Sequence, residues 1–165
     1  MSRSRPSIMR FTFRFTFVTL SLLTITLATA ARDDAPVSGL FKGNGKEAKL
    51  AYLTAKHGDQ DRKGRIILLF SEKDPSKEKD PETAAMFGRL DSALIITIKP
   101  DGKITGCHVA HSAHGKGGFT SLGEIEMKDF KLADGKIQGK LTSGGEQKAF
   151  GETWEVDLKF STKLP

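Results

Sequence analysis

The feature of this sequence that most constrains its fold is a series of short apolar runs separated by strong turn signals. Asn44-Gly45, Pro100-Asp101-Gly102 and Asp134-Gly135 supply residues that tight turns between antiparallel strands require. The runs between such turns have the length of strands rather than helices. We expect strands at residues 37–42, 49–57, 65–71, 92–98, 103–110, 121–132, 135–143 and 153–160.

The last of these runs has the clearest strand pattern. From Trp154 to Phe160 every second residue is apolar and the residues between are charged, so one face is predicted to be buried and the other exposed. One short helix interrupts the strands. Asp80-Pro81 supplies an N-cap and a first-turn proline, and Gly88 is suited to end the helix.

About eight strands joined mostly by tight hairpins form an antiparallel meander, and such a sheet can remove its two edges by closing. Glycines within the predicted strands are typical of bulges and barrel corners. The sequence therefore predicts an all-β fold, a single antiparallel up-and-down barrel of about eight strands with one short helix. A two-sheet β-sandwich is the alternative. We expect one such domain over residues 31–165.

The first thirty residues have the pattern of an export signal. Four arginines precede an apolar run at residues 15–27, and Ala28-Thr29-Ala30 matches the small-residue cleavage pattern. The apolar run is shorter than the roughly 20 residues that a spanning helix needs. We therefore expect a signal peptide at residues 1–30 and a mature protein without a membrane span, in the periplasm or outside the cell.

The net charge does not indicate a nucleic-acid partner. The formal charge is +6, but without the four leader arginines the 26 basic residues fall to 22, against 20 acidic ones. The remaining charges are interspersed along the chain, whereas nucleic-acid binding is typical of a strongly basic domain. We predict no nucleic-acid partner.

Two segments carry a resemblance to known proteins. FKGNGKEAKLAYLTA (41–55) and FGETWEVDLKFS (150–161) are similar to the ends of small exported bacterial proteins that are β-rich and uncharacterised. In architecture alone the chain resembles lipocalins and other calycins, although Gly39-Leu40-Phe41 stands where those proteins have Gly-x-Trp. The resemblance carries no catalytic motif. It implies export and a β fold, and it implies no activity.

The connections of an up-and-down meander alternate between its two ends. The longer ones, at residues 43–48, 72–91, 111–120 and 144–152, are expected at one end. Ligand sites often occupy the mouths of barrels, so this end is predicted to bind a small apolar molecule or a protein partner. The predicted ligand-binding residues are Trp154, Phe160, Tyr52 and Phe119. Plain core packing is the alternative for Trp154 and Phe160.

Three of the four histidines lie in CHVAHSAHGKGG, residues 107–118. In a regular strand His108 and His111 point to opposite faces, whereas His111 and His114 can converge in a turn. With a carboxylate from another loop they would suit zinc or copper. His108 could join them through a bulge in its strand. The candidate carboxylates are Asp74, Glu78, Asp80 and Glu146. Ordinary polar loop histidines, with no cofactor, are the alternative.

No complete catalytic constellation is present, so the sequence predicts no catalytic residues and favours a protein that is not an enzyme. The single cysteine, Cys107, is expected to be buried and inert. Three hypotheses remain. The favoured one is an exported, non-enzymatic β-barrel that binds at its long-loop end. The others are a metal-binding protein or metal-dependent hydrolase using His111 and His114, and an inhibitor or interaction module using the mouth loops.

Overall fold

The computed structural model describes residues 35–115 and 117–165. The predicted leader and its cleavage point after Ala30 lie outside the described residues. The helical elements are η1 (Gln60–Arg62), η2 (Pro75–Lys77) and α1 (Pro81–Met86). The strands are β1 (Val37–Gly43), β2 (Lys46–Glu47), β3 (Tyr52–His57), β4 (Ile66–Ser71), β5 (Ala93–Ile98), β6 (Ile104–Ala110), β7 (Phe119–Thr120), β8 (Glu126–Ala133), β9 (Lys136–Thr142), β10 (Gln147–Ala149) and β11 (Glu152–Lys163).

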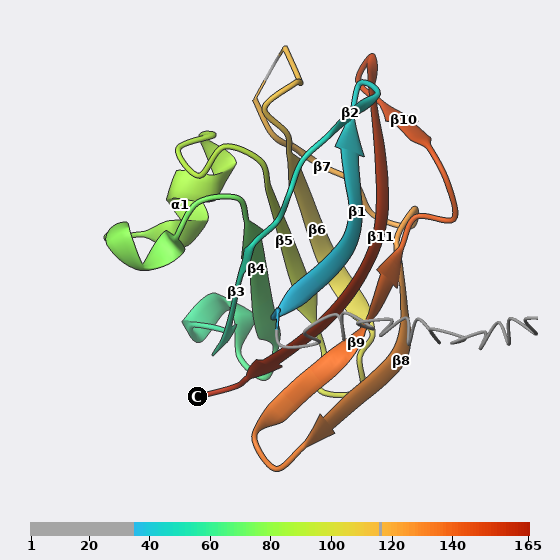
Figure 1. Cartoon of the computed structure of the whole chain (residues 1–165). Helices are drawn as coiled ribbons and strands as arrows, with labels where there is room; N and C mark the ends of the chain where they lie inside the picture. The colour runs from blue at the N-terminus through green and yellow to red at the C-terminus, as the bar shows by residue number, and fades with distance from the viewer. Residues whose placement is uncertain (1–34, 116) are drawn as a thin grey trace, which may run out of the picture. The chain divides into compact units, whose positions relative to one another are not determined.

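Two antiparallel sheets pack face to face (Figure 1). The first sheet has the order β2-β1-β11-β9-β8, with β10 paired to β11, and the second has the order β3-β4-β5-β6-β7. The predicted all-β class with one short helix is confirmed. The predicted closed barrel is wrong, and the two-sheet sandwich fits the described residues better.

The sandwich retains the cyclic strand order of the expected barrel. The first strand pairs with the last one along its whole length, from Val37 opposite Phe160 to Gly43 opposite Trp154. The ladder is interrupted at two seams, between β2 and β3 and between β7 and β8. One side of each seam is a strand of only two residues, β2 or β7. Such a short strand does not extend the ladder. The sheets are therefore joined by packing and not by hydrogen bonds across these seams.

Apolar side chains from both sheets fill the space between them. The largest completely buried ones include Trp154 and Phe41 from the first sheet and Phe70 and Leu94 from the second. Ala48 and Leu50, in the link between β2 and β3, contribute to the same core. This link therefore packs into the core. The predicted strand 49–57 would instead have continued the hydrogen-bonded ladder at this point.

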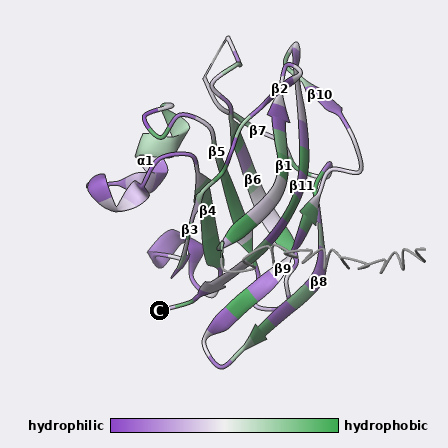
Figure 2. Cartoon of the chain, in the orientation of Figure 1, coloured by the Kyte–Doolittle hydropathy of each residue, from purple (hydrophilic) through white to green (hydrophobic). Residues whose placement is uncertain are grey.

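Two neighbouring strands of the second sheet, β4 and β5, are buried on both faces. Every residue of β4 and β5 is buried, because α1 and the segment after it cover the outer face. Figure 2 shows the resulting hydrophobic colour along β4 and β5 and the alternation along β8 and β9. The helix begins where the sequence predicts, since the Asp80 carboxylate accepts a hydrogen bond from the Thr83 amide at 3.1 Å.

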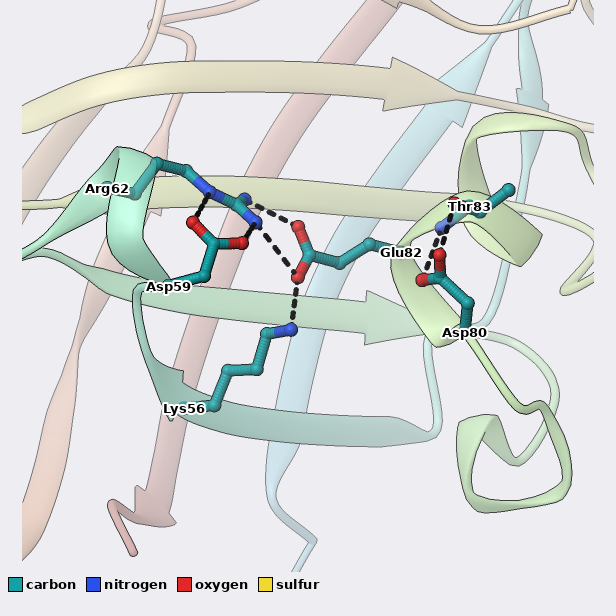
Figure 3. Close-up of polar contacts among 6 residues, drawn as sticks. All are labelled: Lys56, Asp59, Arg62, Asp80, Glu82 and Thr83. Carbon is teal, nitrogen blue, oxygen red and sulfur yellow. Dashed lines mark hydrogen bonds and ion pairs between the residues drawn. The ribbon is translucent and has the colours of Figure 1, made fainter.

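An ion-pair cluster fastens α1 to the sheet (Figure 3). The Glu82 carboxylate binds Lys56 at 2.5 Å and Arg62 at 2.6 Å, and Arg62 also binds Asp59 at 2.6 Å. Burial acts to raise the pKa of Glu82, but the hydrogen bonds from Arg62 and Lys56 outweigh it and hold this pKa below its ordinary value. In the part of the chain that the structure describes, no helix has the length and apolar character needed to cross a membrane.

Candidate functional site

Three connections meet at one end of the sandwich. They are the β1–β2 turn at Asn44-Gly45, the segment from His111 to Gly115, and the β10–β11 turn at Phe150-Gly151 (Figure 1). We call the segment His111–Gly115 the histidine loop and the three connections together the loop end. The fourth long connection of the sequence prediction, residues 72–91, mostly covers the outer face of the second sheet instead.

Asn44 joins the three connections. Its backbone has a φ of 48°, as the tight turn requires. The Asn44 side-chain amide donates to the Ala113 carbonyl at 3.1 Å, and its carbonyl oxygen accepts from the Thr153 amide at 2.9 Å. One side chain therefore holds the histidine loop against the start of β11.

Glu152 completes the hydrogen-bond network that joins these connections. Its carboxylate accepts hydrogen bonds from the Asn44 side chain and, at 3.0 Å, from the Gly115 amide. Sequence reasoning missed both residues. The sequence around Asn44 indicates only a turn, and Glu152 is separated from its partners by 108 and 37 positions, so no local pattern connects them.

The structure brings His111 and His114 together. Their ring centroids are 5.4 Å apart, and the two residues are 6% and 9% exposed. The rings lie over Gly43, where an added Cβ would come within 2.7 Å of His111 Nδ1 and of His114 Nε2. The absence of a side chain at Gly43 is therefore what lets both rings pack against β1.

His108 lies apart from this pair. Its neighbours along the strand, Cys107 and Val109, belong to the core between the sheets, so the His108 side chain lies on the opposite face of β6. It stands opposite Ile95 of β5, and Gly118 passes over its ring. Burial lowers the pKa of His108. The predicted three-histidine group is thus reduced to two neighbouring rings.

The hydrogen bonds of the two rings assign the same tautomer to both but use different ring nitrogens. His111 Nδ1 accepts from the Ala113 amide at 3.0 Å, which places the ring proton on Nε2. His114 Nε2 lies 3.0 Å from the Thr153 carbonyl oxygen, which can only accept, so the His114 proton is also on Nε2. His114 therefore has a lone pair without a partner at Nδ1, whereas the Nδ1 lone pair of His111 accepts from the Ala113 amide.

Three of the four acidic residues expected to complete a metal site are engaged elsewhere. Asp80 caps α1, Asp74 accepts from Ser76, and Glu78 pairs with Arg89. Among the described residues, no group of three or more His, Cys, Asp or Glu side chains is placed to hold a metal ion. Zinc or copper binding by His111 and His114 stays a prediction, one that requires the His111 ring to give up its bond to Ala113.

Burial controls the acid–base behaviour of this region. It lowers the pKa of His111, the neighbouring His114 lowers it further, and Glu72 opposes both effects. The neutral imidazole is therefore the favoured form. Burial also raises the pKa of the Cys107 thiol to about 12, so this cysteine is not a thiolate near neutral pH.

The four predicted ligand-binding residues do not line one cavity. Trp154 and Phe160 are 1% and 5% exposed and pack in the core, Phe160 edge-on against Phe70. Tyr52 is 40% exposed and points away from the core, because its neighbour Leu53 points into it. Only Phe119 lies at the loop end, where its ring packs on His114 at 5.4 Å.

Phe150 is the exposed aromatic residue of the loop end. Its side chain is 76% exposed, and its ring contacts Phe119 at a centroid distance of 5.8 Å. The β10–β11 turn presents it with a φ of 54°, followed by Gly151 at 86°. Sequence reasoning missed Phe150.

Comparison with known proteins finds no family model, no curated protein and no solved structure that matches this chain. The similarity to exported β-rich proteins and to lipocalins therefore stays a prediction.

Proposed function

We propose that this protein is a non-enzymatic binding module whose loop end contacts a protein partner, with Phe150 as the anchoring side chain. The observation that carries the proposal is the 76% exposure of Phe150 on a tight turn. When a partner covers a large apolar ring that was exposed to water, the free energy of the system falls. Aromatic residues are accordingly enriched in protein interfaces.

The support beneath Phe150 favours this role. Phe150 contacts Phe119, Phe119 contacts His114, and His114 is hydrogen-bonded to Thr153 of β11. A ring supported in this way has little conformational freedom to lose on binding, which lowers the entropic cost of association. Asn44 and Glu152 supply polar groups beside it, as at the rim of an interface.

A protein partner fits these features better than a small apolar molecule does. The space between the sheets is occupied by core side chains such as Trp154 and Phe41, so an apolar ligand there would have to displace them. An exposed ring with polar neighbours matches an apolar pocket on a partner surface. We place the activity after export, in the periplasm or outside the cell, on the basis of the predicted leader at residues 1–30.

The experiment uses a photo-crosslinking phenylalanine analogue at position 150 in the producing cell. Position 87 is the matched control, because Phe87 is also 76% exposed but lies at the end of α1. We expect a specific cross-linked protein from position 150 and none from position 87. With that partner purified, Phe150→Ala should weaken binding by at least about tenfold, as for an interface hot spot, and Phe87→Ala should leave it unchanged. Equal cross-linking at both positions, or an unchanged affinity for Phe150→Ala, would contradict the proposal.

A further inference from the structure

The outer face of the first sheet carries a cluster of lysines. Along β9 and β11 the residues Ile137, Leu141 and Leu158 point into the core, so the residues between them point outward. The register continues this outward face onto β8. We call the following six residues the lysine face: Lys128, Lys131, Lys136, Lys140, Lys159 and Lys163.

Lysines stand directly opposite one another on this face. Lys159 of β11 is opposite Lys140 of β9, and Lys140 is opposite Lys128 of β8. Further along, Lys163 is opposite Lys136. Like charges directly opposite each other destabilise a sheet. The arrangement therefore works against folding and concentrates positive potential on one surface, which a bound polyanion would offset.

Internal ion pairs compensate only part of this charge. Lys140 pairs with Asp157 at 2.9 Å, and Lys128 lies 3.6 Å from Glu126. Within the part of the chain that the structure describes, the other four lysines of the face have no ion pair. Their ammonium groups are available to an external anion.

A groove of about 400 Å³ crosses the centre of this face. It combines cationic groups with hydroxyl and amide groups, and one carboxylate lies at its side. The residues that carry these groups are Lys140, Lys159, Ser38, Ser161, Gln138 and Asp129, and Ala35, Gly139 and the core residue Phe160 complete the lining. Ammonium groups suit a carboxylate or sulfate, whereas hydroxyl and amide groups suit sugar hydroxyls. The groove therefore matches the chemistry of an acidic sugar.

The spacing of the lysines favours a polymer over a single ion. Neighbouring strands lie about 4.8 Å apart, and Lys136 and Lys140 are separated by about 14 Å along β9. That separation exceeds the Debye length of about 8 Å at physiological salt, so one small anion does not neutralise both ends of the face. A chain with repeated negative charges neutralises both ends of the face.

Phe160 lines the groove but is 5% exposed and belongs to the core, so the face presents no aromatic side chain on which a base could stack, and this favours a polysaccharide over a nucleic acid. Single-stranded nucleic acids bind to sheets largely by stacking bases on aromatic side chains. Among the outward-pointing residues of the described strands β1, β8, β9 and β11, none is aromatic. The geometry points to the lysine face as a binding surface for a linear anionic polysaccharide. This surface is separate from the loop end and does not depend on its proposed function.

The test measures binding of the purified protein to a size-defined heparin oligosaccharide by titration at several salt concentrations. The variant Lys131→Gln/Lys136→Gln/Lys159→Gln removes three of the four lysines of the face that have no ion pair among the described residues. The control Lys49→Gln/Lys63→Gln/Lys99→Gln removes the same charge from exposed lysines elsewhere. We expect the test variant to bind at least about tenfold more weakly at about 50 mM salt. The slope of log Kd against log salt should fall by about 2, since three contacts are lost.

Three results would overturn the proposal. The first is no heparin binding by the wild type at low salt, and the second is an equal loss in the test and control variants. The third is tighter binding of an oligothymidine of the same charge, which would assign the face to nucleic acid. Phe150→Ala should bind heparin like the wild type, so failure of this proposal and failure of the loop-end proposal are distinguishable.

Discussion

The replacement Gly43→Ala tests how the histidine loop is held. Gly43 is not among the residues with positive φ, so its backbone accepts alanine without strain. The new Cβ would lie 2.7 Å from His111 Nδ1 and 2.7 Å from His114 Nε2, where ordinary contact begins at 3.4 Å. Both rings would therefore have to move outward.

The cost follows from what the rings would lose. Outward movement breaks the bond from the Ala113 amide to His111 and the bond from His114 to the Thr153 carbonyl, each 3.0 Å long. At roughly 0.5–1.5 kcal/mol for each hydrogen bond, the two losses amount to about 1–3 kcal/mol. The same range, about 1–3 kcal/mol, is usual for an extra methyl group in a packed core. We expect Gly43→Ala to lower the free energy of unfolding by about 2 kcal/mol.

The assay is urea unfolding followed by the fluorescence of Trp154, the single tryptophan of the chain. Gly115→Ala in the same loop is the matched control, because its nearest contact would be an ordinary one, 3.6 Å from Glu152. The control should change stability by less than about 0.5 kcal/mol. A comparable change for both variants, or a loss below about 0.5 kcal/mol for Gly43→Ala, would refute the packing argument.

Two further predictions concern stability. Trp154→Ala should lower the free energy of unfolding by about 3–5 kcal/mol, because the ring is completely buried; a loss below about 1 kcal/mol in urea unfolding, followed by circular dichroism because the variant has no tryptophan, would contradict its place in the core. Burial lowers the pKa of His111 and His108, so the unfolded chain binds these protons more readily than the folded protein does. The resulting stabilisation is complete above the ordinary histidine pKa of about 6.5 and is lost as the pH falls from there through the lower folded values. His111→Asn should make the free energy of unfolding less dependent on pH in this range, and an unchanged pH dependence would refute the assignment.

Most of the local structure could be predicted because its causes are local. Asn44-Gly45, with φ values of 48° and 73°, forms the turn that its composition indicates. Asp80 caps the helix that its sequence predicts. The alternation from Trp154 to Phe160 describes a strand with one buried face, and those residues are in the core. Each feature depends on residues within a few positions of one another.

The candidate site was predictable only in part. The convergence of His111 and His114 depends on a short turn, but their position over Gly43 brings together residues about seventy positions apart. The tautomers depend on Ala113 and on Thr153, a residue of another strand. Asn44 and Glu152 carry no local signal for the joint that they form, since that joint exists only once three connections meet.

The sequence by itself determined most of the longer strands, the tight turns, the short helix and the buried face of the last strand, because hydrophobic period and turn chemistry act over a few residues. Only the tertiary structure decided whether the meander closes. Closure depends on ladder pairs across the seams, and there the two-residue strands β2 and β7 stop while Ala48 and Leu50 enter the core. The tertiary structure also decided that lysines of three strands stand in one row, because register and not sequence spacing sets which residues lie opposite each other.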